Sequence, residues 1–158
     1  MKRYGLQMTQ ELAKFLTTTL NNKYATQSGT ATHRLLRHVV IDDVFGDTGS
    51  PEIIAQIKQT PNLIRYFSKD AKTEVPIAGI INGTFISRRI DRLLIEDLTK
   101  TIYFIDYKTD INKTALIEKY KKQLGEYAQL LKSVYPNYKI LGFVLWTHDW
   151  CLEQIIQQ

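Results

Sequence analysis

Three acidic residues of this sequence could meet on one side of a β-sheet. Asn82-Gly83, inside an extended apolar stretch, is the strongest short signal for a hairpin turn. Positions equally distant from such a turn face each other across the two strands, which places Glu74 opposite Asp91. A second turn within residues 97–100 places Asp91 opposite Asp106 in the same way. The spacing therefore predicts a row of three carboxylates across adjacent strands.

A row of carboxylates needs a compensating positive charge. Opposed side chains of antiparallel strands have β-carbons about 5 Å apart, and like charges placed there destabilise the sheet. Lys108 follows Asp106 by two positions, so the period of a strand brings its ammonium to the same face. Oxygen ligands favour Mg2+ or Mn2+ over Zn2+. We therefore predict a divalent-metal catalytic site formed by Asp91, Asp106, Lys108 and Glu74.

The same residues allow a plainer interpretation. Asp-x-Lys is a common pattern, and Asp70-Ala71-Lys72 is a second instance in an expected loop. Charged strand residues usually mark a solvated face, so Asp106 and Lys108 taken alone would be a surface ion pair. A β-bulge, which Pro76 favours, would also shift the position of Glu74 by one residue.

The amino-terminal part of the chain reads as helices. Apolar residues recur at helical spacing within residues 6–20, and a second stripe within residues 35–40 follows Ser28-Gly29-Thr30. Ser50-Pro51-Glu52 has the form of an N-cap, an N1 proline and an acidic first turn. Because Pro61 interrupts the pattern that follows, we expect the third helical region to form two short pieces.

The rest of the chain predicts an α/β fold. The isoleucine-rich residues 74–108, with their two turns, indicate a three-stranded antiparallel meander. Residues 114–134 have helical spacing and end before Pro136, and residues 138–147 read as a buried returning strand. We expect helices to flank this sheet.

Length and composition indicate one globular domain with a polyanionic partner. The 158 residues carry a net charge of +5 and suffice for a single core, with helices in residues 1–70 and a catalytic core in residues 71–150. Cys151 is the sole cysteine, which excludes an internal disulfide and an iron–sulfur cluster and fits a reducing cytoplasm. The sequence contains no signal peptide, membrane span or Gly-Lys-Ser/Thr phosphate loop, so we expect no membrane association and no ATP site.

Three runs together resemble a known signature. They are Arg89-Ile90-Asp91-Arg92-Leu93, Ile105-Asp106-Tyr107-Lys108-Thr109 and Gln123-Leu124-Gly125-Glu126-Tyr127. The combination is similar to the RecB-like branch of the PD-(D/E)XK nucleases, the domain at the carboxyl end of AddA- and RecB-type helicase subunits, over residues 29–147. The resemblance implies a restriction-endonuclease-like core and Mg2+- or Mn2+-dependent, exonuclease-type hydrolysis of DNA. It also implies work in double-strand break repair or recombination, as the partner or a fragment of a helicase-nuclease.

The resemblance also assigns metal ligands. The family's histidine ligand follows a small-residue turn and opens a helix, which matches His33 in Gly29-Thr30-Ala31-Thr32-His33. Taken alone, His33 would be an ordinary helix histidine, like His38. With His33, the implied ligands are Asp91, Asp106 and the backbone carbonyl of Tyr107. Glu74 matches an acidic position at the start of the family's first core strand.

Other positions match DNA contacts of the family. Gln123 and Tyr127 lie four residues apart on one helical face, where the family positions the DNA backbone. The pattern alone would assign Tyr127 to the apolar stripe of the helix. Arg88 stands where many relatives have a small residue and could add a phosphate contact. The remaining basic candidates are Arg89 and Lys122, the latter beside Lys113, Lys119 and Lys121, which could equally form a solvated face.

Two other classes of function compete with the nuclease. A catalytically inactive DNA-binding module of a repair complex would explain the charge and the fold, although all the core residues of a nuclease are present. A purely structural assembly domain would explain the basic charge but not the row of carboxylates.

Overall fold

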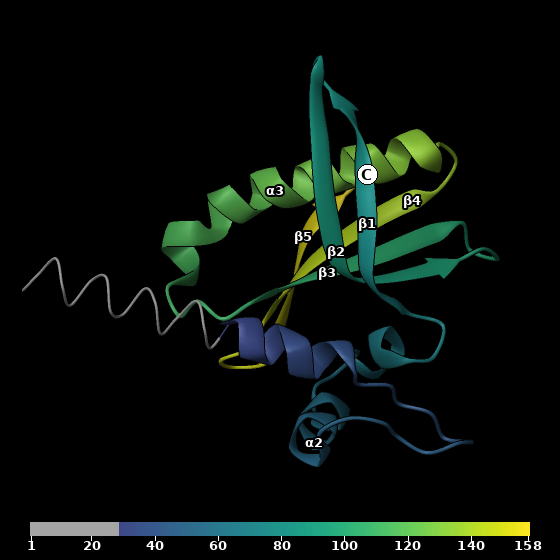
Figure 1. The fold of residues 1–158 in the computed structure, drawn as a ribbon, viewed down its shortest axis with the longest axis vertical. Helices are drawn as coiled ribbons and strands as arrows, with labels where there is room; N and C mark the ends of the chain where they lie inside the picture. Colours follow the sequence, from purple (N-terminus) through teal and green to yellow (C-terminus); the bar gives the residue numbers. More distant parts are fainter. Residues whose placement is uncertain (1–28) are drawn as a thin grey trace, which may run out of the picture.

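The computed structural model describes residues 29–158, so the helix predicted within residues 6–20 lies outside the described residues. Residues 29–37 are helical. The elements that follow are α2 (Pro51–Gln59), the 3₁₀ helix η1 (Ile64–Phe67), β1 (Lys72–Ile81), β2 (Thr84–Glu96), β3 (Thr101–Lys108), α3 (Lys113–Val134), β4 (Lys139–Trp146) and β5 (Cys151–Gln157). Figure 1 shows α3 lying along the sheet and the described segments that precede β1 lying below the sheet in this view.

The strands form one mixed sheet in the order β1-β2-β3-β4-β5. The first three strands are an antiparallel meander, α3 then returns the chain, and β4 runs parallel to β3. The predicted α/β class, meander, helix and returning strand are therefore confirmed. The structure adds β5, an antiparallel edge strand that extends the sheet to Gln157, beyond the predicted core limit at residue 150.

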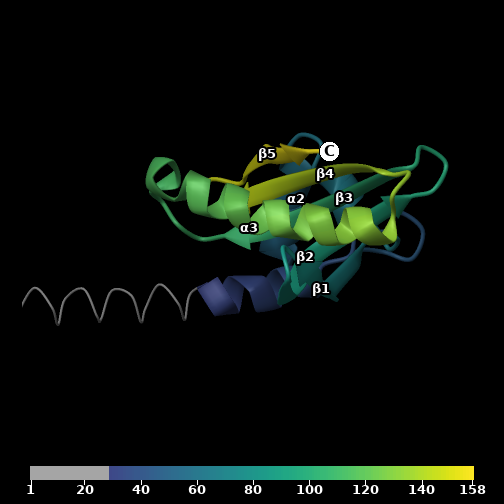
Figure 2. The ribbon, with the colours of Figure 1, turned by 90° about the horizontal axis from the view of Figure 1, so that it is seen from above.

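One face of the sheet is covered by α3, as Figures 1 and 2 show together. The Asn112 side chain accepts a hydrogen bond from Ala115 N and starts the helix, and Tyr120, Leu124 and Tyr127 recur on its buried face. These residues pack against every second residue of β3 and β4, including Ile102, Phe104, Ile140 and Val144.

The opposite face is covered by the segments before β1. Leu36, Ile57 and Phe67 pack there against Ile105 and Tyr107 of β3. The third helical region is two short pieces, α2 and η1, as predicted.

Two details of the amino-terminal part differ from the sequence analysis. Residues 29–32 are already helical, so the small-residue turn expected before His33 is wrong. The helix also ends at residue 37, and Val40 instead forms a β-bridge with Thr48. Ser50 precedes α2 as expected, but its hydroxyl donates to the Glu52 carboxylate, and its side chain caps no backbone N–H.

Both predicted strand registers are confirmed. Ile81 pairs with Thr84 around the Asn82-Gly83 turn, where both turn residues have positive φ values of 50° and 77°. The β2–β3 register runs from Glu96↔Thr101 to Arg92↔Ile105. Among the described residues, no helix is long and apolar enough to cross a membrane.

Candidate catalytic site

Asp91 and Asp106 lie where the β2–β3 ladder ends. The last ladder pair is Arg92↔Ile105, one position before the two aspartates would face each other. At that point Asp91 Oδ2 accepts a hydrogen bond from the backbone N–H of Tyr107 at 2.8 Å, so a side chain takes the place of a ladder carbonyl. Both aspartates are buried, with 8% and 4% of their surface exposed.

An irregularity in β1 and β2 frees Asp91 from the ladder. Ile90 and Leu93 both pack on the α3 side although they are three residues apart, so the alternation of faces breaks between them. In β1 the break falls at Glu74, whose φ of 55° is a left-handed conformation that few residues other than glycine adopt. Glu74 and Asp91 are therefore opposed by register, yet they form no ladder pair between Thr73↔Arg92 and Val75↔Ile90.

His33 brings the amino-terminal helix to the same point. Its Nε2 lies 3.0 Å from the carbonyl oxygen of Tyr107, and its Nδ1 lies 3.5 Å from Asp91 Oδ1. The hydrogen bond to Asp91 raises the pKa of His33 above its usual value, against the opposing effect of burial. His33 thus contacts two of the other implied metal ligands, Asp91 and the Tyr107 carbonyl.

Arg92 fastens that helix to the sheet. Its guanidinium donates to the carbonyl oxygens of Leu36 at 2.8 Å and Val39 at 3.1 Å, at the end of the helix that carries His33. It also donates to the hydroxyl of Tyr107 at 2.8 Å and lies 4.0 Å from the ring centre of Phe67. Sequence reasoning gave Arg92 no role, although a charged residue inside a buried strand was a signal for one.

Asp106 and Lys108 point toward α3. Lys108 Nζ lies 2.5 Å from Asp106 Oδ2 and 4.4 Å from the ring centre of Tyr120. Despite this ion contact, Oδ2 is buried and has no well-aligned hydrogen bond within the described part of the chain. Burial raises the pKa of Asp106, and the nearby Asp91 raises it further, while the Lys108 ammonium lowers it. Lys108 is therefore the cationic partner of Asp106 Oδ2, while Oδ1 accepts the 3.4 Å hydrogen bond from Gln123.

Gln123 links the charged pair to α3. Its Nε2 donates to the Tyr127 hydroxyl at 2.7 Å and to Asp106 Oδ1 at 3.4 Å, while its Oε1 accepts from Lys108 at 3.4 Å. Tyr127 is only 3% exposed, and burial raises its pKa to about 12. Tyr127 therefore contacts Gln123 from within the packed face of α3 and is too buried to make the direct DNA contact that was expected of it. Tyr120, which supports the Lys108 ammonium, was missed because its place in the apolar stripe gave no separate signal.

The remaining predicted residues lie around this centre. Glu74 is held by Arg89, whose Nε is 2.8 Å from its carboxylate, so Glu74 does not complete a row with the two aspartates. Arg88 forms an ion pair with Glu126 at 2.8 Å and joins β2 to α3. Lys122 is exposed on α3.

The expected ligands do not form a preassembled metal cage. Within residues 29–158, no group of three or more histidine, cysteine, aspartate or glutamate side chains is arranged to hold a metal ion. His33 instead directs its two nitrogens at the oxygens of Asp91 and Tyr107, the contacts that a protonated imidazole makes.

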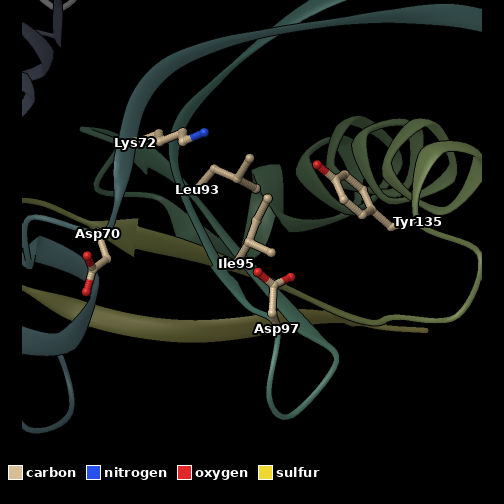
Figure 3. A pocket seen from close by; sticks show the side chains of 6 residues that line it. All are labelled: Asp70, Lys72, Leu93, Ile95, Asp97 and Tyr135. Carbon is tan, nitrogen blue, oxygen red and sulfur yellow. The ribbon is translucent and has the colours of Figure 1, made fainter.

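The second Asp-x-Lys pattern lies in a different place. Asp70 and Lys72 line a hollow of about 270 Å³ together with Asp97 and Tyr135, shown in Figure 3. None of the predicted site residues lines it. Asp70 and Lys72 are both exposed, whereas Asp106 and Lys108 form a largely buried pair. Burial therefore separates the two instances and favours Asp106 and Lys108 for chemistry.

Comparison with known proteins adds no assignment. No protein-family model matches the chain, and no curated protein matches it.

Proposed function

We propose that this chain is a divalent-metal-dependent deoxyribonuclease with a restriction-endonuclease-like core of the RecB-like branch. The observation that carries the proposal is the buried Asp106 carboxylate, which is ion-paired with Lys108 and lies close enough to Asp91 for their negative charges to interact. Buried carboxylates and a lysine that perturb one another in this way are typical of active sites.

The donor atoms suit Mg2+ or Mn2+. Asp91 and Asp106 supply carboxylate oxygens, Tyr107 supplies a backbone carbonyl and His33 supplies an imidazole nitrogen. Two neighbouring carboxylates at the end of adjacent strands favour a cation between them. Such an ion, when bound, would polarise the phosphate and lower the pKa of a water molecule. His33 would give up its proton to become a ligand.

Lys108 supplies the positive charge that phosphodiester hydrolysis needs. Its ammonium is held by Asp106, supported by the Tyr120 ring and within reach of Gln123 Oε1. A preorganised cation stabilises negative charge that develops on a phosphate in the transition state. Gln123 positions both members of the Asp106–Lys108 pair.

DNA is the proposed substrate because the chain is basic and the resemblance is to DNA nucleases. The net charge of +5 favours a polyanion, and the exposed cations near the site include Arg89 and Lys122. Action with a helicase subunit in double-strand break repair, in the cytoplasm, is part of the proposal and rests on the resemblance.

A DNA-binding module without catalysis is the second candidate. Its supporting observation is that His33, Asp91 and Asp106 are not arranged as a three-residue metal group in the described chain.

A cleavage assay separates the two functions. Labelled single- and double-stranded DNA is incubated with the protein in Mg2+, in Mn2+ and in chelator, with Asp106→Ala as the matched variant. If the chain is a nuclease, the original protein cleaves DNA in Mg2+ or Mn2+ but not in chelator. The Asp106→Ala variant does not cleave DNA in any of the three conditions. DNA binding without cleavage in either metal would favour the binding module.

A further inference from the structure

The β1–β2 hairpin extends beyond the rest of the sheet. Figure 1 shows its turn, Asn82-Gly83, standing clear of α3. One face of the hairpin packs on α3: a β-carbon on Gly79 would come within 2.8 Å of Leu130, and Arg88 pairs with Glu126 on the helix. The other face of the hairpin therefore points away from α3.

That outer face carries an exposed apolar pair at its far end. The ladder pairs there are Pro76↔Arg89, Ala78↔Ser87 and Ile80↔Phe85. Ile80 is 74% exposed and Phe85 is 69% exposed. Within the described chain this is the one ladder pair in which both residues are exposed large hydrophobic residues. Contiguous exposed apolar side chains are a feature of interaction and ligand-binding surfaces.

The part of the hairpin between Glu74 and Asp91 carries no negative charge. Residues 76–90 include Arg88 and Arg89 but no aspartate or glutamate. Arg89 lies on the outer face, its side chain is 67% exposed, and it holds Glu74 at the edge of the candidate catalytic site. A strand rises about 3.4 Å per residue, so Phe85 is on the order of 20 Å from Asp91 along β2. The outer face thus extends from the candidate catalytic site past the Arg89 guanidinium to the Phe85 ring.

We infer that this outer face binds an unpaired DNA strand that leads to or from the catalytic site. The inference rests on the proposed nuclease function and names its substrate class, DNA with a single-stranded segment. Phe85 stacks on an unpaired base, because a base within a duplex does not expose its face. Arg89 contacts a phosphate. The small side chains of Ala78 and Ser87 leave space for the DNA strand between Arg89 and Phe85. The absence of carboxylates from residues 76–90 favours a polyanion over a protein partner.

The test is the affinity of the full chain for dye-labelled oligothymidine, measured by fluorescence anisotropy in chelator at several salt concentrations. Phe85→Ala should weaken binding about 5- to 100-fold, the range of one aromatic stacking contact, while Phe85→Trp should retain it. The matched control is Phe45→Ala, since Phe45 is 84% exposed in a loop outside the hairpin and should leave the affinity unchanged.

Salt dependence separates stacking from charge. Phe85→Ala should leave the slope of log affinity against log salt unchanged. Arg89→Ala should reduce the magnitude of that slope by about one, the change expected when one phosphate contact is lost. Unchanged affinity in Phe85→Ala, or an equal loss in Phe45→Ala, overturns the inference. It is also overturned if Phe85→Ala alters only self-association in sedimentation, because the pair would then contact protein.

The result is independent of the nuclease assay. Phe85-dependent binding without cleavage in Mg2+ would preserve the hairpin site and remove the nuclease. Cleavage together with DNA binding that does not depend on Phe85 would support the nuclease and remove the hairpin site.

Discussion

Arg92 and Asp106 are buried charges on neighbouring strands, and the structure treats them in opposite ways. Arg92, 1% exposed on the side of the amino-terminal helices, donates to three backbone carbonyls and the Tyr107 hydroxyl. Asp106, 4% exposed on the α3 side, keeps one oxygen that has an ion contact but no well-aligned hydrogen bond in the described part of the chain.

The difference separates a structural charge from a candidate catalytic one. A buried charge whose every nitrogen donates to a protein acceptor holds elements together, and Arg92 joins the helix of His33 to the sheet. A buried carboxylate that is held by one ammonium beside a second carboxylate is typical of functional sites instead. The predictions below test this division, from the largest expected effect to the smallest.

Replacing Arg92 should destabilise the fold. Arg92→Met leaves the carbonyl oxygens of Val39 and Tyr66 without their donor, and the Tyr107 hydroxyl loses its partner too. The Leu36 carbonyl keeps the Val39 N–H, and each unsatisfied buried group costs about 1–3 kcal/mol. We expect the free energy of unfolding to fall by about 3 kcal/mol or more in urea denaturation. The exposed Arg89→Met is the control, with a change of about 0.5 kcal/mol or less. Equal losses in the two variants would remove the structural role of Arg92.

Replacing Lys108 should remove catalysis while metal binding persists. Lys108→Ala takes away the cation that stabilises phosphate charge, so cleavage should fall about 100- to 1,000-fold. Because a neighbouring cation opposes metal binding, Mn2+ affinity should not decrease. The control is Lys139→Ala, an exposed lysine at the start of β4. A cleavage rate in Lys108→Ala equal to that of the original protein would contradict the role given to this lysine.

The two histidines of the amino-terminal helical region should behave differently. His33→Ala removes a proposed metal ligand, so the Mg2+ concentration that half-saturates cleavage should rise by about tenfold or more. His38 is exposed and contacts Arg37 rather than the site, so His38→Ala should leave that concentration unchanged. Similar shifts in both variants would mean that the chosen histidine is wrong.

Replacing Asp106 together with Lys108 should have the smallest effect on stability. Asp106→Asn combined with Lys108→Met removes both members of the ion pair and leaves neither charge buried alone, so the free energy of unfolding should change by less than about 1 kcal/mol or increase. Urea denaturation alongside Arg92→Met makes the comparison direct. A loss as large as that of Arg92→Met would make the Asp106–Lys108 pair a structural one.

The fold was predictable from local signals, and the site only in part. Asn82-Gly83 and the second turn specify both registers, which is why Asp91 and Asp106 were found together. Pro76 favoured a β-bulge near Glu74, but the register is the same on both sides of Glu74. The break in alternation there has no local signal of its own, because it depends on how β2 bends from β1 toward β3. Glu74 is consequently held by Arg89 rather than placed in the row.

Two further features depend on contacts distant in the sequence. Arg92 donates to a carbonyl that lies 56 residues away in the sequence, and no local sequence pattern predicts such a contact. The edge strand β5 was missed because its half-exposed residues lack a regular alternation of apolar and polar side chains.

The most direct test of the account is a calorimetric Mn2+ titration of Asp106→Asn beside the original protein. If the Asp106 carboxylate is a metal ligand, the original protein binds Mn2+ and the variant, titrated at a temperature at which it is folded, loses that binding. If the variant binds Mn2+ with unchanged affinity and heat, the Asp91–Asp106 site is not the metal centre and the nuclease proposal fails.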